Sequence, residues 1–411
     1  MERNLKARIK EAFQTVPLYC NVAMEQGLDI ETILNQEKWN EIPIIDKKWI
    51  VEKEQSILTP EGVVQSYQGK LIHARTSGST GEYMDIYWTH HDYTNSMLPL
   101  WWGRYHYYGI RPSDRLCFFN TLHPEGKDED IREKNYLGFS KSNLTESRMK
   151  EIYEKMLEFQ PKWLLLQPSI AVLLCQCKEK FQLPPLACVT YIELSGELLR
   201  EEVRKLLKQH FNCQIANQYG ANEFNSIAYE CPCGKLHIME SNVYVESIPN
   251  ESGESELIIT TKTNSVMPLI RYRIGDYGVI EQNETCTCGN RSPVLKLTLG
   301  RTNDWIICEN SEKINSYVFI RAMDYANYHM EGSVKQFQII QTDFKQFEVC
   351  VVLEEEEELP KLERLFHEGL LEQRLKDAEY VFEYKERLML DEKSGKLACI
   401  KDGRKINVSK G

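Results

Sequence analysis

A short run of hydroxyl residues and glycines has the composition of an anion-binding loop. The run consists of Thr76, Ser77, Gly78, Ser79, Thr80 and Gly81. Glycine lets the backbone approach a ligand closely, and successive N–H groups together with hydroxyls can surround phosphate oxygens. The flanking segments 70–75 and 83–88 have strand character, so we expect a hairpin with an anion at its tip. For these residues alone, an ordinary Ser/Gly turn is the alternative.

Other residues farther along the chain could complete a nucleotide site. From Tyr219 through Gly220 to Glu223, a ring and a carboxylate stand at the expected end of a strand, and the carboxylate could bind Mg²⁺. Asp276 ends a Tyr-Arg-Ile-Gly-Asp segment, where we expect a tight turn and a carboxylate that accepts both hydroxyls of a ribose. Arg301 follows a glycine and offers a fixed cation. Each signal is weak alone, but together they indicate a site that binds a nucleoside triphosphate.

Two cysteine pairs have the spacing of metal ligands. Cys231 and Cys233 precede His237, and Cys286 and Cys288 follow in the same β-rich region. Thiolates in Cys-x-Cys-Gly turns together with one histidine suit a closed tetrahedral zinc site. Five candidates compete for four positions, and unligated thiols are the alternative. Such a metal would be structural, because nothing in the sequence points to an open coordination position.

The elements that must position these residues alternate between strands and helices. After a helical N-terminus, this alternation predicts an α/β fold with a largely parallel sheet and helices on its faces. Ligands of such sheets bind at the carboxyl ends of the strands, where we expect 195–197 and 219–223. We expect strands at 116–119, 163–166, 189–194 and 213–217, and helices at 93–108, 146–159 and 199–211.

The pattern also predicts a division into domains. Residues 1–302 are expected to form a large N-terminal domain, which contains an antiparallel, β-rich zinc subdomain at about 229–294. Residues 303–411 are expected to form a small, mobile α+β domain. In that domain we expect a hairpin over 336–353, a helix at 359–376 and a strand at 380–389. The aromatic helix 93–108 could line a substrate pocket or belong to the core.

Composition excludes several classes of protein. The 411 residues carry a net charge of −11, which argues against a nucleic-acid backbone as the main partner. No apolar run reaches the length of a membrane span, and the charged N-terminus lacks the apolar core of a signal peptide. Many of the 13 cysteines lie in apolar contexts, as buried thiols do in a reducing compartment. We therefore expect a cytoplasmic protein without a membrane partner.

With these motifs in this order, the chain resembles the adenylate-forming superfamily of acyl-coenzyme A ligases and luciferases. Within the superfamily, the closer likeness is to the branch of phenylacetate–coenzyme A ligase, coenzyme F synthetase-like and capsule-biosynthesis proteins. The likeness spans nearly the whole chain, through segments 42–46, 109–114, 167–169 and 395–405. It implies ATP and AMP as ligands, Mg²⁺ and a coenzyme A acceptor, and it raises a homodimer as an assembly to test.

The resemblance also implies roles for individual residues. The loop 76–81 would grip the triphosphate, and Thr80 and Glu223 would lie near Mg²⁺. Lys396, in a Ser-Gly-Lys-Leu-Ala segment, matches the catalytic lysine and would neutralise charge that develops on the α-phosphate. The remaining matches are Gly196 and Glu197 beside adenine, Tyr219 and Gly220 in the Tyr-Gly-x-x-Glu motif, Asp276 and Arg301 at the ribose, and Cys231, His237, Cys286 and Cys288 around zinc, with Cys233 as alternate.

Three functions follow from this resemblance. The first is an AMP-forming ligase that activates an aryl or small organic acid and passes the acyl group to coenzyme A. The second is an adenylating enzyme that passes it to an amine or a carrier protein. The third is a catalytically silent nucleotide-binding scaffold. Two departures from the family suggest it: Glu82 stands where the family often has lysine, and Asn303 where it usually has aspartate or lysine.

Overall fold

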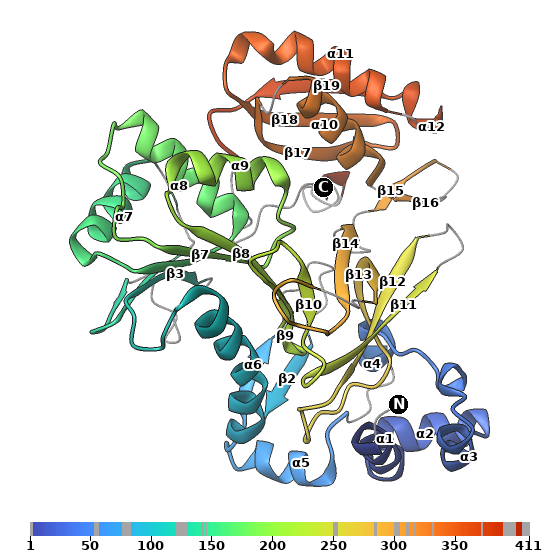
Figure 1. The fold of residues 1–411 in the computed structure, drawn as a ribbon. Helices are drawn as coiled ribbons and strands as arrows, with labels where there is room; N and C mark the ends of the chain where they lie inside the picture. Colours follow the sequence, from blue (N-terminus) through green and yellow to red (C-terminus); the bar gives the residue numbers. More distant parts are fainter. Residues whose placement is uncertain are drawn as a thin grey trace. The chain divides into compact units, whose positions relative to one another are not determined.

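A computed structural model gives the fold, which divides into two compact units (Figure 1). The first unit joins Met1–Pro112 to Ala216–Leu299, and the second joins Ser113–Ile215 to Gly300–Gly411. The structure describes residues 3–52, 57–75, 84–120, 130–140, 144, 146–249, 254–282, 286–299, 305–309, 313–315, 317–330, 333–370, 373–388 and 400–404.

The first unit begins with short helices and continues with antiparallel strands. Its helices are α1 (Arg3–Thr15), α2 (Pro17–Gln26), α3 (Ile30–Asn35), the 3₁₀ helix η1 (Trp39–Glu41), α4 (Lys47–Glu52), α5 (Pro60–Tyr67) and α6 (His90–Tyr108). Its strands are β1 (Ile72–Arg75), β2 (Asp85–Trp88), β8 (Gln214–Ala221, inside this unit from Ala216 on), β9 (Asn225–Glu230), β10 (Leu236–Ile238), β11 (Val243–Pro249), β12 (Ser255–Thr261), β13 (Tyr272–Glu281) and β14 (Val294–Leu299).

The sheet of the first unit has the order β11-β12-β13-β14-β10-β9-β8, with antiparallel pairing between neighbours. This confirms the antiparallel character predicted for 229–294. One apolar core joins the N-terminal helices to this sheet, since Leu5, Tyr19 and Ile33 are buried in the same cluster as Leu257 and Ile259. The N-terminal helices therefore cover the sheet rather than standing apart from it.

Helix ends in this unit follow from local chemistry. Pro17 stands at the start of α2, where its missing N–H costs nothing, and Gly27 ends that helix with a φ of 62°. The hydroxyl of Thr89 accepts the N–H of Asp92 at the start of α6, and Gly109 ends α6 with a φ of 66°. The predicted helix 93–108 is confirmed and starts one turn earlier.

The N-terminal part of the second unit is the predicted α/β layer. Its elements are β3 (Leu116–Asn120), β4 (Ile131–Arg132), β5 (Tyr136–Ser140), α7 (Glu146–Phe159), β6 (Trp163–Leu166), α8 (Pro168–Lys180), β7 (Tyr191–Ser195) and α9 (Glu201–His210). The strand order is β7-β6-β3-β5-β4, parallel except for β4, which is antiparallel to β5. The predicted parallel sheet with helices is confirmed for the strands expected at 116–119, 163–166 and 189–194. The strand expected at 213–217 is the start of β8, which pairs antiparallel with β9.

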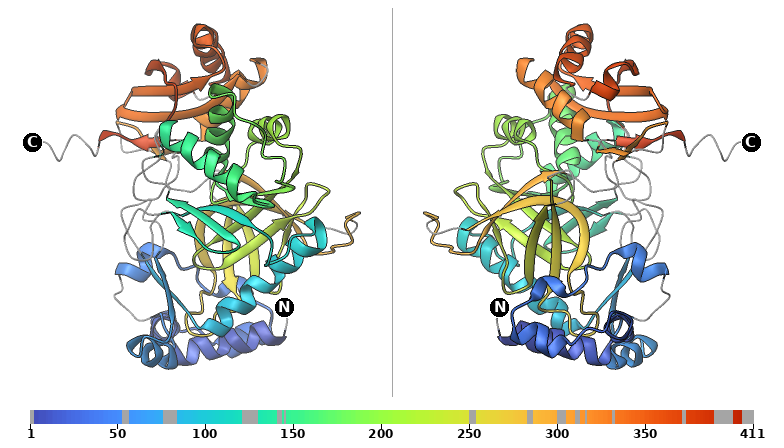
Figure 2. Two further views of the ribbon diagram at one scale, coloured as in Figure 1. Left: turned by 90° about the vertical axis from the view of Figure 1, so that its left-hand side faces the viewer. Right: turned by 90° about the vertical axis from the view of Figure 1, so that its right-hand side faces the viewer.

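The C-terminal part of the second unit is an α+β structure with its own apolar core. Its elements are β15 (Trp305–Ile307), β16 (Lys313–Asn315), α10 (Tyr317–His329), β17 (Val334–Asp343), β18 (Gln346–Leu353), η2 (Glu356–Glu358), α11 (Leu359–Gly369), α12 (Gln373–Lys376), β19 (Glu379–Tyr384) and β20 (Ile400–Asp402). Phe319 and Phe366, from α10 and α11, are buried in one cluster with Val349 and Val351 of β18. Figure 2 shows these helices, orange to red, on one face of the sheet β19-β18-β17-β20.

Two expectations for this part need adjustment. The helix predicted at 359–376 is two helices, because α11 ends at Gly369 and α12 begins at Gln373. The strand predicted at 380–389 ends at Tyr384. The domain boundary between 302 and 303 stays a prediction. Within the part of the chain that the structure describes, no helix combines the length and apolar character needed to cross a membrane.

Candidate functional site

The predicted phosphate loop lies between two paired strands. β1 and β2 are antiparallel, with Ile72 opposite Trp88 and Arg75 opposite Asp85. This pairing confirms the hairpin that was expected around 76–81. The six loop residues, Thr76 to Gly81, and Glu82 lie outside the described residues, as do Arg301, Asn303 and Lys396. Their predicted roles therefore remain proposals.

Glu223 lies at the tip of the β8–β9 hairpin. The tip comprises residues 222–224, and Phe224 donates its N–H to the carbonyl of Ala221 at 3.0 Å. Tyr219 and Gly220 were expected beyond the end of a strand, but both lie inside β8 and pair with β9. The motif is therefore a hairpin, with only its carboxylate residue at the end.

The structure brings Tyr219 and Asp276 together. The hydroxyl of Tyr219 donates to the Oδ2 of Asp276 at 2.7 Å, although 57 residues separate the two in the chain. Both side chains are half-buried. Asp276 was expected after a tight turn, but it lies within β13, directly after Gly275, whose φ is 85°. Because glycine tolerates this φ, the strand can bend here and still continue.

Gly196 and Glu197 form the turn after β7 in the second unit. Gly196 is exposed and has a φ of 84°. The carboxylate of Glu197 accepts the N–H of Ser169 at 2.9 Å and its hydroxyl at 2.7 Å, at the start of α8. A carboxylate at a helix N-terminus satisfies N–H groups that have no partner within the helix. Glu197 thus fixes α8 to this turn, an interaction that the sequence did not suggest.

Four predicted metal ligands of the first unit lie together. One ligand atom from each of Cys231, His237, Cys286 and Cys288 falls within 4.8 Å of the others. The sulfurs of Cys231 and Cys286 are 3.8 Å apart, and the Sγ of Cys288 is 3.4 Å from the Nε2 of His237. Tetrahedral zinc with thiolate and imidazole ligands requires separations of about 3.5–3.8 Å, so the geometry fits this metal.

The surroundings of these residues fit a metal as well. The Nδ1 of His237 is 3.0 Å from the carbonyl oxygen of Ser292, which can only accept, so Nδ1 carries the proton and Nε2 presents its lone pair. Burial lowers the pKa of His237, which favours the neutral imidazole that a metal requires. Burial raises the pKa of the Cys231 thiol to about 12, and a bound cation would favour its thiolate.

Cys233, the alternate ligand, lies apart from this cluster. It is exposed, and its Sγ is 3.0 Å from the hydroxyl of Thr287. Cys233 lies in a turn, where Gly234 has a φ of 74° and donates its N–H to the carbonyl of Cys231. Because the chain reverses here, residues two apart point in different directions. The structure therefore favours Cys231 over Cys233.

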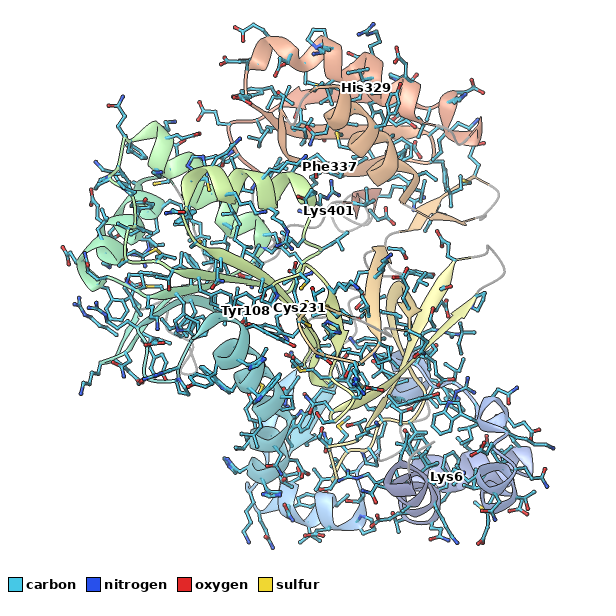
Figure 3. All side chains as sticks on the ribbon, viewed as in Figure 1. Lys6, Tyr108, Cys231, His329, Phe337 and Lys401 are labelled. Atoms are coloured by element: carbon cyan, nitrogen blue, oxygen red, sulfur yellow. The ribbon has the colours of Figure 1, made fainter. Side chains whose placement is uncertain are left out.

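Helix α6 supplies neighbours of the cluster that the sequence analysis did not identify. The hydroxyl of Tyr107 lies 3.9 Å from the Sγ of Cys288, and the hydroxyl of Tyr108 donates to the carbonyl of Glu230 at 2.7 Å. Figure 3 shows Tyr108 and Cys231 near one another. An ideal Cβ on Gly103 would lie 2.8 Å from the ring of Tyr229, so glycine permits the close packing of α6 on β9. Aromatic content marked this helix, but the contacts depend on tertiary packing.

Comparisons with known proteins agree with these motifs. A family model described as the CapK C-terminal domain matches residues 306–403. Protein CapK of Staphylococcus aureus is 23% identical over 324 residues, which cover 76% of this chain and 69% of CapK. Phenylacetate-coenzyme A ligase of Thermus thermophilus is 29% identical over 162 residues, or 36% of each chain. The chain is therefore similar to CapK and, over a shorter stretch, to phenylacetate-coenzyme A ligase, in agreement with the branch that its motifs resemble.

Solved structures of adenylate-forming enzymes show the same fold. A crystal structure of 2-hydroxyisobutyryl-CoA ligase, in the postadenylation state with a 2-hydroxyisobutyryl adenylate (2-HIB-AMP), matches with a TM-score of 0.74. The match covers 99% of this chain and 89% of that ligase, at 13% identity. At this identity the likeness concerns the fold alone, so the activity has to be argued from the residues.

Proposed function

We propose that this protein is an ATP-dependent, AMP-forming carboxylate ligase that transfers the activated acyl group to coenzyme A. The observation that carries the proposal is the hydrogen bond between Tyr219 and Asp276. Two residues that the motifs assign to the nucleoside, from segments far apart in the chain, meet in one place. The sequence relatives support the same class, since one of them is a phenylacetate-coenzyme A ligase.

Tyr219 and Asp276 could hold a nucleoside as a pair. A carboxylate has about four acceptor positions, so one bond from a tyrosine leaves capacity for the two hydroxyls of a ribose. The bond also orients the carboxylate, because its partner is a half-buried ring on another strand, β8, of the same unit. Preorganisation of this kind reduces the entropy that binding costs. The ring face of Tyr219 would then border the nucleotide.

The reaction would proceed in two displacements. An oxygen of the substrate carboxylate attacks the α-phosphorus of ATP, the bond from this phosphorus to the bridging oxygen breaks, and pyrophosphate leaves. The thiol of coenzyme A then attacks the acyl carbonyl and loses its proton, and AMP leaves. Mg²⁺ would neutralise phosphate charge when bound. Glu223 and Thr80 would hold the ion, and the residues 76–81 and Lys396 would stabilise charge on the phosphates.

Pyrophosphate exchange tests the first step. We expect labelled pyrophosphate to enter ATP in the presence of one acid from a panel of aryl and small organic acids, and Asp276→Asn to reduce the rate. Product formation with coenzyme A, amines and carrier proteins then identifies the acceptor. If ATP binds but no acid supports exchange and no acyl-AMP is found by mass spectrometry, the protein is the nucleotide-binding scaffold and the ligase proposal is wrong.

A structural zinc ion would occupy the cluster of Cys231, His237, Cys286 and Cys288. All four ligand positions would come from the protein, so the ion would join the loop after β9 to the loop before β14. Cys231→Ser and Cys233→Ser are a matched pair. We expect metal analysis to find about one zinc ion per chain in the Cys233 variant and much less in the Cys231 variant. Equal zinc content in both variants would contradict the assignment.

A further inference from the structure

The hairpin tip that carries Glu223 has a strongly restricted backbone. An ideal Cβ on Gly220 would lie 2.1 Å from the backbone oxygen of Asn225, so only glycine fits this position without a shift of the strands. Asn225 itself has a φ of 58°, a region in which asparagine is one of the few tolerated residues other than glycine. The register of β8 and β9 shifts between Tyr219 and Gly220, as it does where a strand pair bends.

The side chain of Asn225 is tied to helix α6. Its Nδ2 donates to the Oγ of Ser96 at 2.7 Å. Ser96 is fully buried, and its own hydroxyl donates to the carbonyl of Tyr93 at 2.7 Å. The hydroxyl proton of Ser96 is therefore engaged, and its oxygen is the acceptor for Asn225. This direction matters, because a partly buried donor that loses its acceptor destabilises the fold.

A second asparagine, Asn242, also links helix α6 to this hairpin. The Nδ2 of Asn242 donates to the carbonyl of Ser96 at 2.6 Å and to the carbonyl of Ser226 at 3.1 Å. Ser226 follows Asn225 in the chain, and its hydroxyl accepts a bond from the Nε2 of Gln218 at 3.2 Å. Ser96, Ser226 and Asn242 are all buried. The network thus joins α6 to both strands of the hairpin.

Both neighbours of Glu223 are held as well. The carbonyl of Asn222 accepts a bond from the Nε1 of Trp88 at 3.3 Å. Phe224 is 1% exposed, within the apolar core, and donates its N–H to Ala221 at 3.0 Å. With a fixed residue on either side, the Cα–Cβ direction of Glu223 is set by the tip and not by Glu223 itself.

We propose that Asn225 and Ser96 are positioning residues for Glu223. Their hydrogen bond, with the left-handed backbone of Asn225, sets the place at which the carboxylate meets the magnesium–triphosphate complex. The inference rests on the proposed function, in which Glu223 contacts that complex. Asn225 and Ser96 act only through the tip, and they belong to none of the motifs that marked the site in the sequence.

Asn225→Gly and Ser96→Ala, singly and together, test this proposal. Glycine readily adopts the backbone of Asn225, so this variant removes the side-chain bond without straining the chain. We expect the KM for ATP in pyrophosphate exchange to rise on the order of tenfold in each single variant, with kcat much less affected. The double variant should resemble the single ones, because all three lack the same bond. An unchanged KM, or effects that multiply in the double variant, would overturn the proposal.

Gln160→Gly is a matched control. Gln160 also has a φ of 58°, and its side chain donates to the carbonyl of Leu157 at 3.1 Å, but it lies at the end of α7 in the second unit. The substitution removes one side-chain bond at a left-handed residue, as Asn225→Gly does. We expect the KM for ATP to stay at the wild-type value. A rise equal to that of Asn225→Gly would show a general effect and overturn the positioning role.

Amide hydrogen exchange gives a second readout that needs no catalysis. Peptides that span 218–228 should exchange faster in Asn225→Gly and in Ser96→Ala than in the wild type, with little change elsewhere. Unchanged exchange in these peptides would show that the bond does not hold the tip. Hydrogen exchange could be faster in the variants although the wild type catalyses no pyrophosphate exchange. That result would support the role of the Asn225–Ser96 bond in holding the tip and would refute the ligase function. The two failures can therefore be distinguished.

Discussion

Arg271 offers the sharpest test of how the sheet of the first unit is stabilised. Its guanidinium is bound to Glu246 through two bonds of 3.1 and 3.0 Å. The two side chains are only 4% and 13% exposed. The same guanidinium donates to the carbonyls of Asn40 and Ile42, which fixes the N-terminal segment next to the start of β13. Arg271 directly precedes the strand that carries Asp276.

Arg271→Met retains a long apolar side chain and removes the charge. The φ of Arg271 is 46°, in the left-handed region. Methionine and arginine have a similar free-energy cost in this conformation, so the substitution leaves the backbone contribution unchanged. The variant leaves Glu246 as an unpaired carboxylate with little access to water. Breaking one partner of a buried ion pair costs about 3–5 kcal/mol. We expect the free energy of unfolding, measured in urea by tryptophan fluorescence, to fall by about 4 kcal/mol.

Arg273→Met, two residues farther along and inside β13, is the control. Arg273 is 39% exposed and pairs with Glu256 at 2.9 Å, so its loss should cost at most about 1 kcal/mol. Adding Glu246→Leu to Arg271→Met should restore much of the lost stability, because it removes the unpaired charge. If Arg271→Met costs no more than Arg273→Met, or if the second substitution restores nothing, burial of the ion pair is not what makes Arg271 important.

Three further predictions follow from the same structure. In Gly220→Ala the new Cβ would lie 2.1 Å from a backbone oxygen of β9. We expect this substitution to lower the free energy of unfolding by about 1–3 kcal/mol and to abolish pyrophosphate exchange. A stable, active variant would refute this. Tyr219→Phe removes the bond to Asp276 and should raise the KM for ATP several-fold, on the order of 1 kcal/mol; an unchanged KM would show that the pair does not touch the nucleotide. Burial raises the pKa of Cys177 to about 11, whereas Cys233 is exposed. At pH 8 we therefore expect iodoacetamide to modify Cys233 well before Cys177, measured by peptide mass spectrometry. Equal rates of modification would contradict the burial of Cys177.

Local chemistry made much of the fold predictable. Pro17 and Gly27 mark helix ends in the sequence because one lacks an N–H and the other accepts a positive φ. The apolar runs at 116–119 and 163–166 are buried strands of a parallel sheet, whose two covered faces require such runs. The spacing of cysteines around two glycine turns identified the Cys and His residues that the structure brings together. In each case the signal lies within a few neighbouring residues.

The sequence by itself therefore determined the resemblance to adenylate-forming ligases, the α/β layer and the set of candidate ligands. The tertiary structure added support for Cys231, which the resemblance already favoured over Cys233, because a turn buries one sulfur and exposes the other. It also placed Tyr219 inside a strand and against Asp276, and joined Asn225 to Ser96 across 129 residues. Such contacts depend on which strands and helices pack together. This pairing is a property of the whole core, and no local spacing records it.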